Sequence, residues 1–118
     1  MPKRVLVIDD DQDIHALVRM VLVSPDYEVE GVENGEIALE KLEKEALPDI
    51  LLLDLMMPQM TGYALLDQLY ERGLHTSLAI IVMSADLITW QQMTRLGIKG
   101  FLTKPFDITD LQQAIENV

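Results

Sequence analysis

The chain has 118 residues, of which 49% are hydrophobic and 5% aromatic, so we expect a single globular domain over residues 1–118 and exclude a disordered segment. It contains no cysteine, which excludes disulfide bonds, thiolate nucleophiles and cysteine-ligated zinc. Because the formal net charge is −11 and no apolar stretch approaches the roughly 20 residues that span a bilayer, we expect a cytoplasmic protein that binds neither nucleic acid nor a membrane directly.

Short apolar runs alternate with amphipathic stretches along the chain, and this alternation predicts five strands and five helices in an α/β fold with a parallel sheet. The first strand is the run 5–8. The helix that begins after Asp11 carries an apolar stripe for the core: Ile14, Leu17, Val18, Val21 and Leu22. His15 lies outside this stripe, so we expect it on the surface. Residues 27–32 alternate between acidic and apolar side chains, as in a half-solvated edge strand.

Two further helices are predicted in the middle of the chain. The helix after the turn at 34–35 points four apolar side chains inward: Ala38, Leu39, Leu42 and Ala46. On its outer face, Glu40 and Lys44 can form an ion pair across one turn. The helix at 62–70 points three leucines inward: Leu65, Leu66 and Leu69. His75 follows in a polar loop.

The last part of the chain contains the fourth and fifth predicted helices. Residues 87–96 form the fourth, on which one face favours packing into the core: Trp90, Met93 and Leu96. The fifth opens at Asp107, an N-cap residue with Asp110 three positions further on. Its inward stripe is Ile108, Leu111, Ala114 and Ile115.

Four of the predicted strands end in polar residues. Asp9 and Asp10 follow the run 5–8, and Asp54 follows the run 50–53. Ser84 follows the run 80–83, and Lys104 follows the run 100–103. The carboxyl ends of neighbouring strands in an open parallel sheet face one crevice. We therefore expect three carboxylates, a hydroxyl and an ammonium to meet there, and this set suits phosphate and a divalent cation.

The three aspartates would repel one another if the first and third strands are neighbours. At about 5 Å and an effective dielectric near 20, each like-charge pair costs about 3 kcal/mol. A bound cation removes this repulsion, and carboxylate oxygens without His or Cys ligands favour Mg²⁺ or Mn²⁺ over zinc. Lys104 and Ser84 supply a charge and a hydroxyl for phosphoryl oxygens, which makes Asp54 the expected nucleophile.

Together these motifs resemble the receiver domain of two-component response regulators over essentially the whole chain. The segments that agree with that family in order and spacing are 7–11 (its acidic strand end), 49–58 with Gly62 (its phosphorylation loop), 83–85 (its hydroxyl strand) and 104–106 (its lysine motif). The resemblance implies a flavodoxin-like (βα)5 three-layer sandwich with a parallel sheet in the order 2-1-3-4-5. It also implies a regulatory domain and not an enzyme, since a receiver catalyses only its own phosphotransfer and slow autodephosphorylation.

The resemblance also implies roles for the acidic residues. Asp54 would accept a phosphoryl group from a sensor histidine kinase or a histidine phosphotransfer protein. Asp10 would bind Mg²⁺ directly, and Asp9 would assist through water. The main-chain carbonyl of Met56 would be a further metal ligand.

A conformational switch is implied in the same way. Lys104 would hold the phosphoryl oxygens, and its peptide bond to Pro105 would be cis. Ser84 would move towards the phosphate, and Phe101 would turn into the space that it leaves. The surface formed by the fourth helix, the fifth strand and the fifth helix would then bind a partner, or a second copy of the chain in a homodimer. Ser84 and Phe101 replace the more frequent Thr and Tyr of the family.

Two other functions remain open. A haloacid dehalogenase-like phosphatase also uses a strand-end Asp with Mg²⁺ and Lys, but its acid–base Asp would fall at Met56, and we expect no cap domain. A pseudo-receiver, which binds partners without phosphorylation, would fit the departures at Ser84 and Phe101. A stand-alone regulator and the receiver of a longer protein are both compatible with the sequence.

Overall fold

Five parallel strands form one sheet in the order β2-β1-β3-β4-β5, which confirms the predicted strand order. The computed structural model describes residues 2–57, 60–85, 90–95 and 97–118. The strands are β1 (Lys3–Ile8), β2 (Tyr27–Val32), β3 (Ile50–Asp54), β4 (Ala79–Ser84) and β5 (Ile98–Thr103). The helices are α1 (Gln12–Val21), α2 (Gly35–Lys44), α3 (Gly62–Glu71), α4 (Trp90–Arg95) and α5 (Ile108–Glu116), with a short 3-10 helix, η1 (Leu74–Thr76), before β4.

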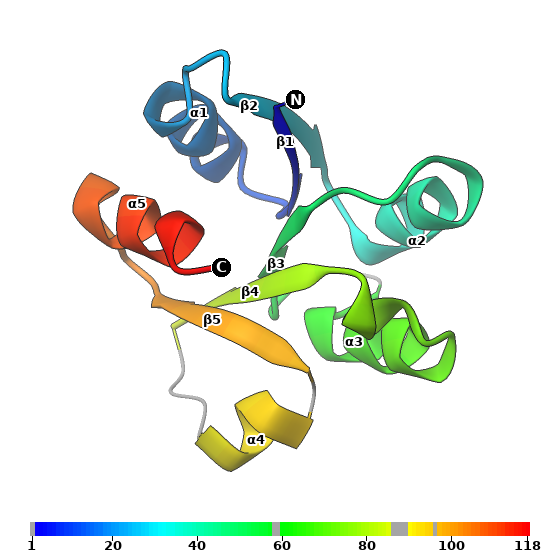
Figure 1. Cartoon of the computed structure of the whole chain (residues 1–118). Helices are drawn as coiled ribbons and strands as arrows, with labels where there is room; N and C mark the ends of the chain where they lie inside the picture. The colour runs from blue at the N-terminus through cyan, green and yellow to red at the C-terminus, as the bar shows by residue number, and fades with distance from the viewer. Residues whose placement is uncertain (1, 58–59, 86–89, 96) are drawn as a thin grey trace.

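Helices cover both faces of the sheet. Figure 1 shows α1 and α5 on one face and α2 and α3 on the other, with α4 beside β5. The chain therefore has the flavodoxin-like three-layer architecture expected from its sequence. In the segments that the structure describes, every helix is too short or too polar to cross a membrane.

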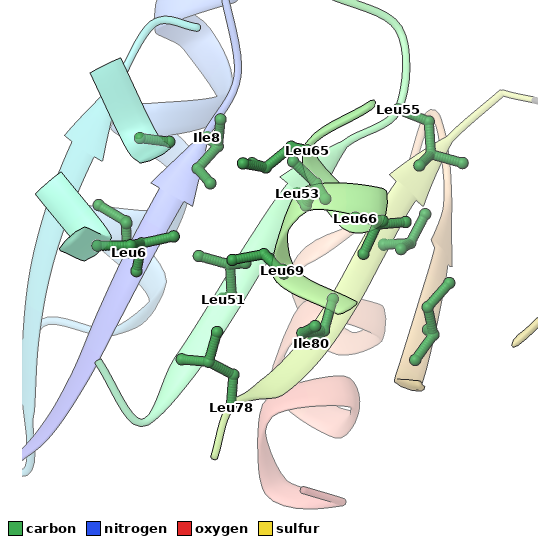
Figure 2. Close-up of a cluster of buried hydrophobic side chains, with 14 of the residues drawn as sticks. Leu6, Ile8, Leu51, Leu53, Leu55, Leu65, Leu66, Leu69, Leu78 and Ile80 are labelled. Atoms are coloured by element: carbon green, nitrogen blue, oxygen red, sulfur yellow. The ribbon is translucent and has the colours of Figure 1, made fainter. Parts of the chain in front are cut away.

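The hydrophobic core lies in two layers, one on each side of the sheet. Between the sheet and α2 and α3, the strand residues Leu51 and Leu53 belong to the same cluster as three leucines of α3, namely Leu65, Leu66 and Leu69 (Figure 2). The buried residues of the other layer are Val5, Val7, Val18, Leu22, Ile50, Leu52, Ile81, Met83, Leu102, Leu111 and Ile115. Because the central strands are covered on both faces, their sequences are nearly continuous apolar runs. This packing fixes the strand ends that carry the polar residues.

The edge strand β2 has the predicted alternation. Glu28 and Glu30 are exposed, and Val29 between them is half-buried. Glu30 forms ion pairs with Lys41 of α2 at 2.6 Å and with Arg4 of β1 at 3.6 Å. Glu30 is therefore tied to the neighbouring strand and helix.

Two predicted local interactions are confirmed. On α2, Lys44 Nζ lies 2.8 Å from Glu40 Oε1, one turn away. At the start of α5, the Asp107 side chain accepts a hydrogen bond from the Asp110 N–H, and the Asp110 side chain accepts one from the Asp107 N–H. This capping box fixes where α5 begins after the loop that contains Lys104.

Three predicted positions are corrected by the structure. His15 is 3% exposed and not on the surface, because its ring occupies the space beside Gly31 of β2. Ala46 is exposed because α2 ends before it. Ile108 is 45% exposed because α5 makes its buried contact with the core from Leu111 onward.

The region around α4 is described only in part. The predicted helix at 87–96 corresponds to α4, whose bounds are Trp90–Arg95. The predicted core-packing face formed by Trp90, Met93 and Leu96 lies outside the described residues and side chains. His75, predicted in a polar loop, lies in η1, where its ring stacks on Tyr70 with centroids 4.3 Å apart.

Candidate functional site

Three carboxylates meet at the carboxyl ends of β1 and β3. These strands are neighbours with Ile8 paired to Leu53, so Asp9 and Asp10 leave β1 beside Asp54. Each aspartate offers an oxygen, and these oxygens lie within 4.8 Å of one another. Asp9 and Asp54 are buried, whereas Asp10 is exposed. The predicted acidic cluster is therefore present, with one member open to solvent.

Lys104 brings a positive charge to two of these carboxylates. Its Nζ lies 2.8 Å from Asp9 Oδ2 and 3.5 Å from Asp54 Oδ2. The Lys104 N–H donates to the Ser84 main-chain oxygen at 2.8 Å, which holds the start of the loop after β5 against the end of β4. The peptide bond between Lys104 and Pro105 is cis, as the resemblance implies.

Asp54 has a different partner on each carboxylate oxygen. Oδ1 accepts a hydrogen bond from the Met56 N–H at 3.0 Å, and Oδ2 faces Lys104. Ser84, at the end of the neighbouring strand β4, is 2% exposed. Because Asp54 pairs in register with Met83, Ser84 lies one residue further towards the carboxyl edge of the sheet. The three residues predicted to bind and receive a phosphoryl group thus lie at adjacent strand ends.

Attraction and repulsion oppose each other at Asp54. At an effective dielectric of about 20, Lys104 at 3.5 Å attracts it by about 5 kcal/mol, and Asp9, within 4.8 Å, would repel it by about 3.5 kcal/mol or more. Asp10 is exposed to water, so at a dielectric of about 80 it adds only about 1 kcal/mol of repulsion. Burial therefore determines the direction in which the pKa of Asp54 shifts. Removal from water, with repulsion by Asp9, raises the pKa of Asp54 above its ordinary 3.8 despite the opposing Met56 N–H and Lys104.

Lys104 stays charged in spite of its partial burial. Burial alone would lower its pKa, but the contacts with Asp9 and Asp54 outweigh burial and raise the pKa above its ordinary 10.5. Three carboxylates and one ammonium leave two negative charges uncompensated, which is the charge of one divalent cation.

The donor set and its dimensions fit Mg²⁺. This ion binds six oxygens at about 2.1 Å in an octahedron, so opposite ligands lie about 4.2 Å apart. The three carboxylate oxygens lie within 4.8 Å of one another, so each can reach a single ion among them either directly or through a water ligand. Oxygen ligands of this kind favour Mg²⁺ or Mn²⁺.

Gly62, at the first position of α3, allows this helix to approach the end of β3. A Cβ on Gly62 would lie 2.4 Å from the Asp54 main-chain oxygen and 2.6 Å from the Leu55 Cα. The Gly62 N–H donates to the Leu55 oxygen at 3.1 Å. A glycine is therefore required here to close the loop that begins at Asp54.

His15 lies beside the site, where the sequence analysis did not place it. Its Nε2 lies 2.7 Å from the main-chain oxygen of Asp9. The available signal was Gly31, since a glycine inside a strand often marks the close approach of another group. A Cβ at Gly31 would lie 2.1 Å from His15 Nδ1.

Phe101, the predicted switch residue, is half-buried and packs against the core layer below α2 and α3. It pairs in register with Val82, and Ser84 pairs with Thr103. Paired residues of parallel strands point to the same face, and so do residues two positions apart in one strand. Phe101 and Ser84 therefore lie on the same face of β5 and β4.

Residues 5–116 match the family described as response regulator receiver domain. The chain belongs to this family. It superposes on the chemotaxis protein CheY4 of Vibrio cholerae with a TM-score of 0.86 and 28% identity, covering 100% of this chain and 99% of that one. The response regulator TrrA of Thermotoga maritima, solved in complex with Mg²⁺ and BeF, gives a TM-score of 0.79 at 26% identity over 97% of this chain and 96% of that one.

The same domain occurs within longer curated relatives. The 3′,5′-cyclic-nucleotide phosphodiesterase regA of Dictyostelium discoideum is 34% identical over 98% of this chain, which spans 15% of regA. The alkaline phosphatase synthesis transcriptional regulatory protein PhoP of Bacillus subtilis is 29% identical over 100% of this chain, which spans 49% of PhoP. The chain thus covers less than half the length of either relative. Receiver domains are regulatory modules of two-component systems and not classical enzymes.

Proposed function

We propose that this receiver is a phosphorylation-activated switch in which Asp54 accepts a phosphoryl group from the phosphohistidine of a sensor histidine kinase or a histidine phosphotransfer protein. One observation carries the proposal: Lys104 contacts both buried carboxylates, Asp9 and Asp54, in a cluster with two uncompensated negative charges. Such a site suits a divalent cation together with a phosphoryl group. The TrrA complex with Mg²⁺ and BeF, a phosphoryl mimic, supports the same assignment by similarity.

In the proposed transfer, a carboxylate oxygen of Asp54 forms a bond to phosphorus while the P–N bond of the phosphohistidine breaks. The electron pair of that bond stays on the imidazole nitrogen, which takes up a proton. Lys104, 3.5 Å from Asp54 Oδ2, would shift from the carboxylate to the phosphoryl oxygens and balance their charge. The Ser84 hydroxyl would donate to the same oxygens.

We assign the metal ligands from the resemblance, with support from the exposure and the contacts of two of the aspartates. Mg²⁺ or Mn²⁺, when bound, supplies charge neutralisation between the carboxylates and the incoming phosphoryl group. Asp10 would bind the ion directly because it is exposed. Asp9, whose Oδ2 already contacts Lys104, would act through water. Asp54 and the main-chain carbonyl of Met56 would complete the protein ligands.

Phosphorylation would reach a partner through Ser84 and Phe101, which lie on the same face of the sheet. Movement of the serine towards the phosphate would leave space for the phenylalanine ring. This change would alter the surface formed by α4, β5 and α5, where an output domain, a separate partner or a second copy in a homodimer would bind. We place this switch in the cytoplasm, without direct binding of nucleic acid or membrane by this chain.

Intact-mass spectrometry after incubation with acetyl phosphate and Mg²⁺ tests the proposal. The wild-type protein should gain one phosphoryl group, and an Asp54→Asn variant should gain none. The matched control is Asp67→Asn, which removes an exposed acid of α3 and should be modified like the wild type. Equal modification of the Asp54→Asn variant, or no modification of the wild type, would show that the assignment is wrong.

A further inference from the structure

A buried histidine contacts the main chain of a residue in the acidic cluster. His15 of α1 is 3% exposed, and its Nε2 lies 2.7 Å from the main-chain oxygen of Asp9. A carbonyl oxygen only accepts hydrogen bonds, so Nε2 carries the hydrogen and donates it. In this way α1 holds the backbone of a site residue through a side chain that the proposed phosphotransfer does not use.

Strand β2 is shaped to admit this ring. Tyr27 and Val29 pack partly against the core layer below α1 and α5, and Gly31 is the next residue on the same face. A Cβ on Gly31 would lie 2.1 Å from Nδ1 and 2.6 Å from Cε1 of His15. Because any side chain at position 31 would displace the ring, the glycine and the histidine form a matched pair.

The hydrogen bond acts on the peptide that joins the two neighbouring acids. The pairing of β1 with β2 ends at Ile8 and Val32, so Asp9 lies one residue beyond the regular ladder. Because a peptide unit is planar, fixing the Asp9 carbonyl also fixes the direction of the Asp10 N–H and Cα. His15 thus orients the backbone that carries the exposed carboxylate of the cluster.

The remaining contacts of Asp9 involve other atoms of the residue. Its N–H donates to the Val32 main-chain oxygen at 3.2 Å. Its Oδ1 accepts a hydrogen bond from the Asp11 N–H at 2.9 Å, and its Oδ2 accepts one from Lys104 at 2.8 Å. The hydrogen bond to Oδ1 closes an Asx turn around the peptide that follows Asp9, but neither carboxylate contact involves the carbonyl oxygen of that peptide. His15 adds a direct contact to this carbonyl.

We propose that His15 is a positioning residue of the metal site: its hydrogen bond to the Asp9 carbonyl keeps the carboxylate of Asp10 directed towards those of Asp9 and Asp54 and so raises the affinity for Mg²⁺. This inference rests on the proposed function, because it requires that the cluster bind a divalent cation. It assigns the histidine no contact with the metal or the phosphoryl group.

Calorimetric titration with Mg²⁺ tests the inference. A His15→Met variant, which removes the donor and keeps a large side chain, should bind Mg²⁺ on the order of 10-fold more weakly. A His15→Gln variant retains an N–H donor at the end of its side chain and should recover most of the affinity. The matched control is Val18→Ala, which opens a cavity at a fully buried position of the same helix. It should lower stability in urea without changing the affinity for Mg²⁺.

A substitution in β2 should disrupt the same hydrogen bond. Gly31→Ala places a Cβ where the ring lies and should weaken Mg²⁺ binding as His15→Met does. The double variant with both His15→Met and Gly31→Ala should bind Mg²⁺ no more weakly than His15→Met alone, because the hydrogen bond to the Asp9 carbonyl is already absent. Nitrogen NMR of the wild-type protein in EDTA, which needs no variant, should show the His15 hydrogen on Nε2.

The outcomes separate this inference from the proposed function. A wild-type protein that does not bind Mg²⁺ would refute both. If the wild type binds Mg²⁺ and His15→Met binds it equally, or if Val18→Ala loses as much affinity, the inference alone is wrong. Should His15→Met fail to fold, Gly31→Ala and the NMR measurement decide, and a ring with hydrogen on Nδ1 only would overturn the positioning role.

Discussion

Replacing Lys104 with Met removes the ammonium that contacts both buried carboxylates. At an effective dielectric of about 20, its contacts correspond to attractions of about 6 kcal/mol with Asp9 at 2.8 Å and about 5 kcal/mol with Asp54 at 3.5 Å. Desolvation, at several kcal/mol per ion, offsets most of this gain. Removing one partner of a buried ion pair typically destabilises a protein by about 3–5 kcal/mol. Because the Lys104 side chain is 23% exposed, we expect Lys104→Met to lower the free energy of unfolding by about 3 kcal/mol.

Urea denaturation in EDTA at neutral pH, followed by circular dichroism, measures this loss. The matched control is Lys41→Met. The Lys41 side chain is also 23% exposed and also contacts two carboxylates, Glu30 at 2.6 Å and Glu45 at 3.1 Å. Those carboxylates are 48% and 49% exposed, so water screens the pairs, and we expect a clearly smaller loss.

Mg²⁺ should distinguish the two lysine variants further. In Lys104→Met a bound cation takes over the compensation of Asp9 and Asp54, so Mg²⁺ should reduce the difference from the wild type. The cluster without Lys104 carries one more uncompensated negative charge and should bind the ion more tightly. At saturating Mg²⁺, each tenfold difference in the dissociation constant reduces the stability difference by about 1.4 kcal/mol. The Lys41→Met variant should respond to Mg²⁺ as the wild type does. A loss in EDTA no larger than that of Lys41→Met, or one that Mg²⁺ leaves unchanged, would refute the reasoning.

Three other predictions concern the loop, the exposed acid and the buried acid. Gly62→Ala should lower the free energy of unfolding by about 2–3 kcal/mol, because its Cβ would lie 2.4 Å from the Asp54 main-chain oxygen; unchanged stability in urea would contradict this close contact. Asp10→Asn should weaken Mg²⁺ binding in calorimetry by on the order of 10-fold or more, with no loss of stability in EDTA. In EDTA, the stability gained by Asp54→Asn over the wild type should be smallest below pH 3.8 and should grow as the pH rises towards the raised pKa of the folded state. Over that range the folded wild type keeps a proton that the unfolded chain has lost, and an advantage that shrinks with rising pH would count against the burial of Asp54.

The sheet order and the acidic cluster could be predicted because both depend on where strands end. A parallel sheet places residues that follow separate apolar runs side by side, so the sequence alone predicts that Asp9, Asp54, Ser84 and Lys104 lie together. The resemblance supplied the order of the strands. What the sequence left undefined was the pairing of charges, since only the structure shows that Lys104 reaches two carboxylates at once.

Three residues whose burial was wrongly predicted show which structural information the helical apolar pattern does not contain. The helical pattern gives the angle of His15 around α1, but its burial depends on the neighbouring strand, where Gly31 leaves room for the ring. The position of Ala46 depended on the end of α2, which stops at Lys44. Ile108 lies on the correct face, but it belongs to the first turn of α5, ahead of the part that contacts the core.

The acidic side chains of β2 discourage the sheet of one molecule from extending into that of another. An edge strand presents unpaired backbone groups that can recruit a foreign strand, and charged residues along it oppose such recruitment. An approaching strand would have to dehydrate Glu28 and break the ion pairs of Glu30 with Arg4 and Lys41. Along this edge, crowded copies of the domain are therefore expected to remain separate molecules instead of joining into a continuous fibre.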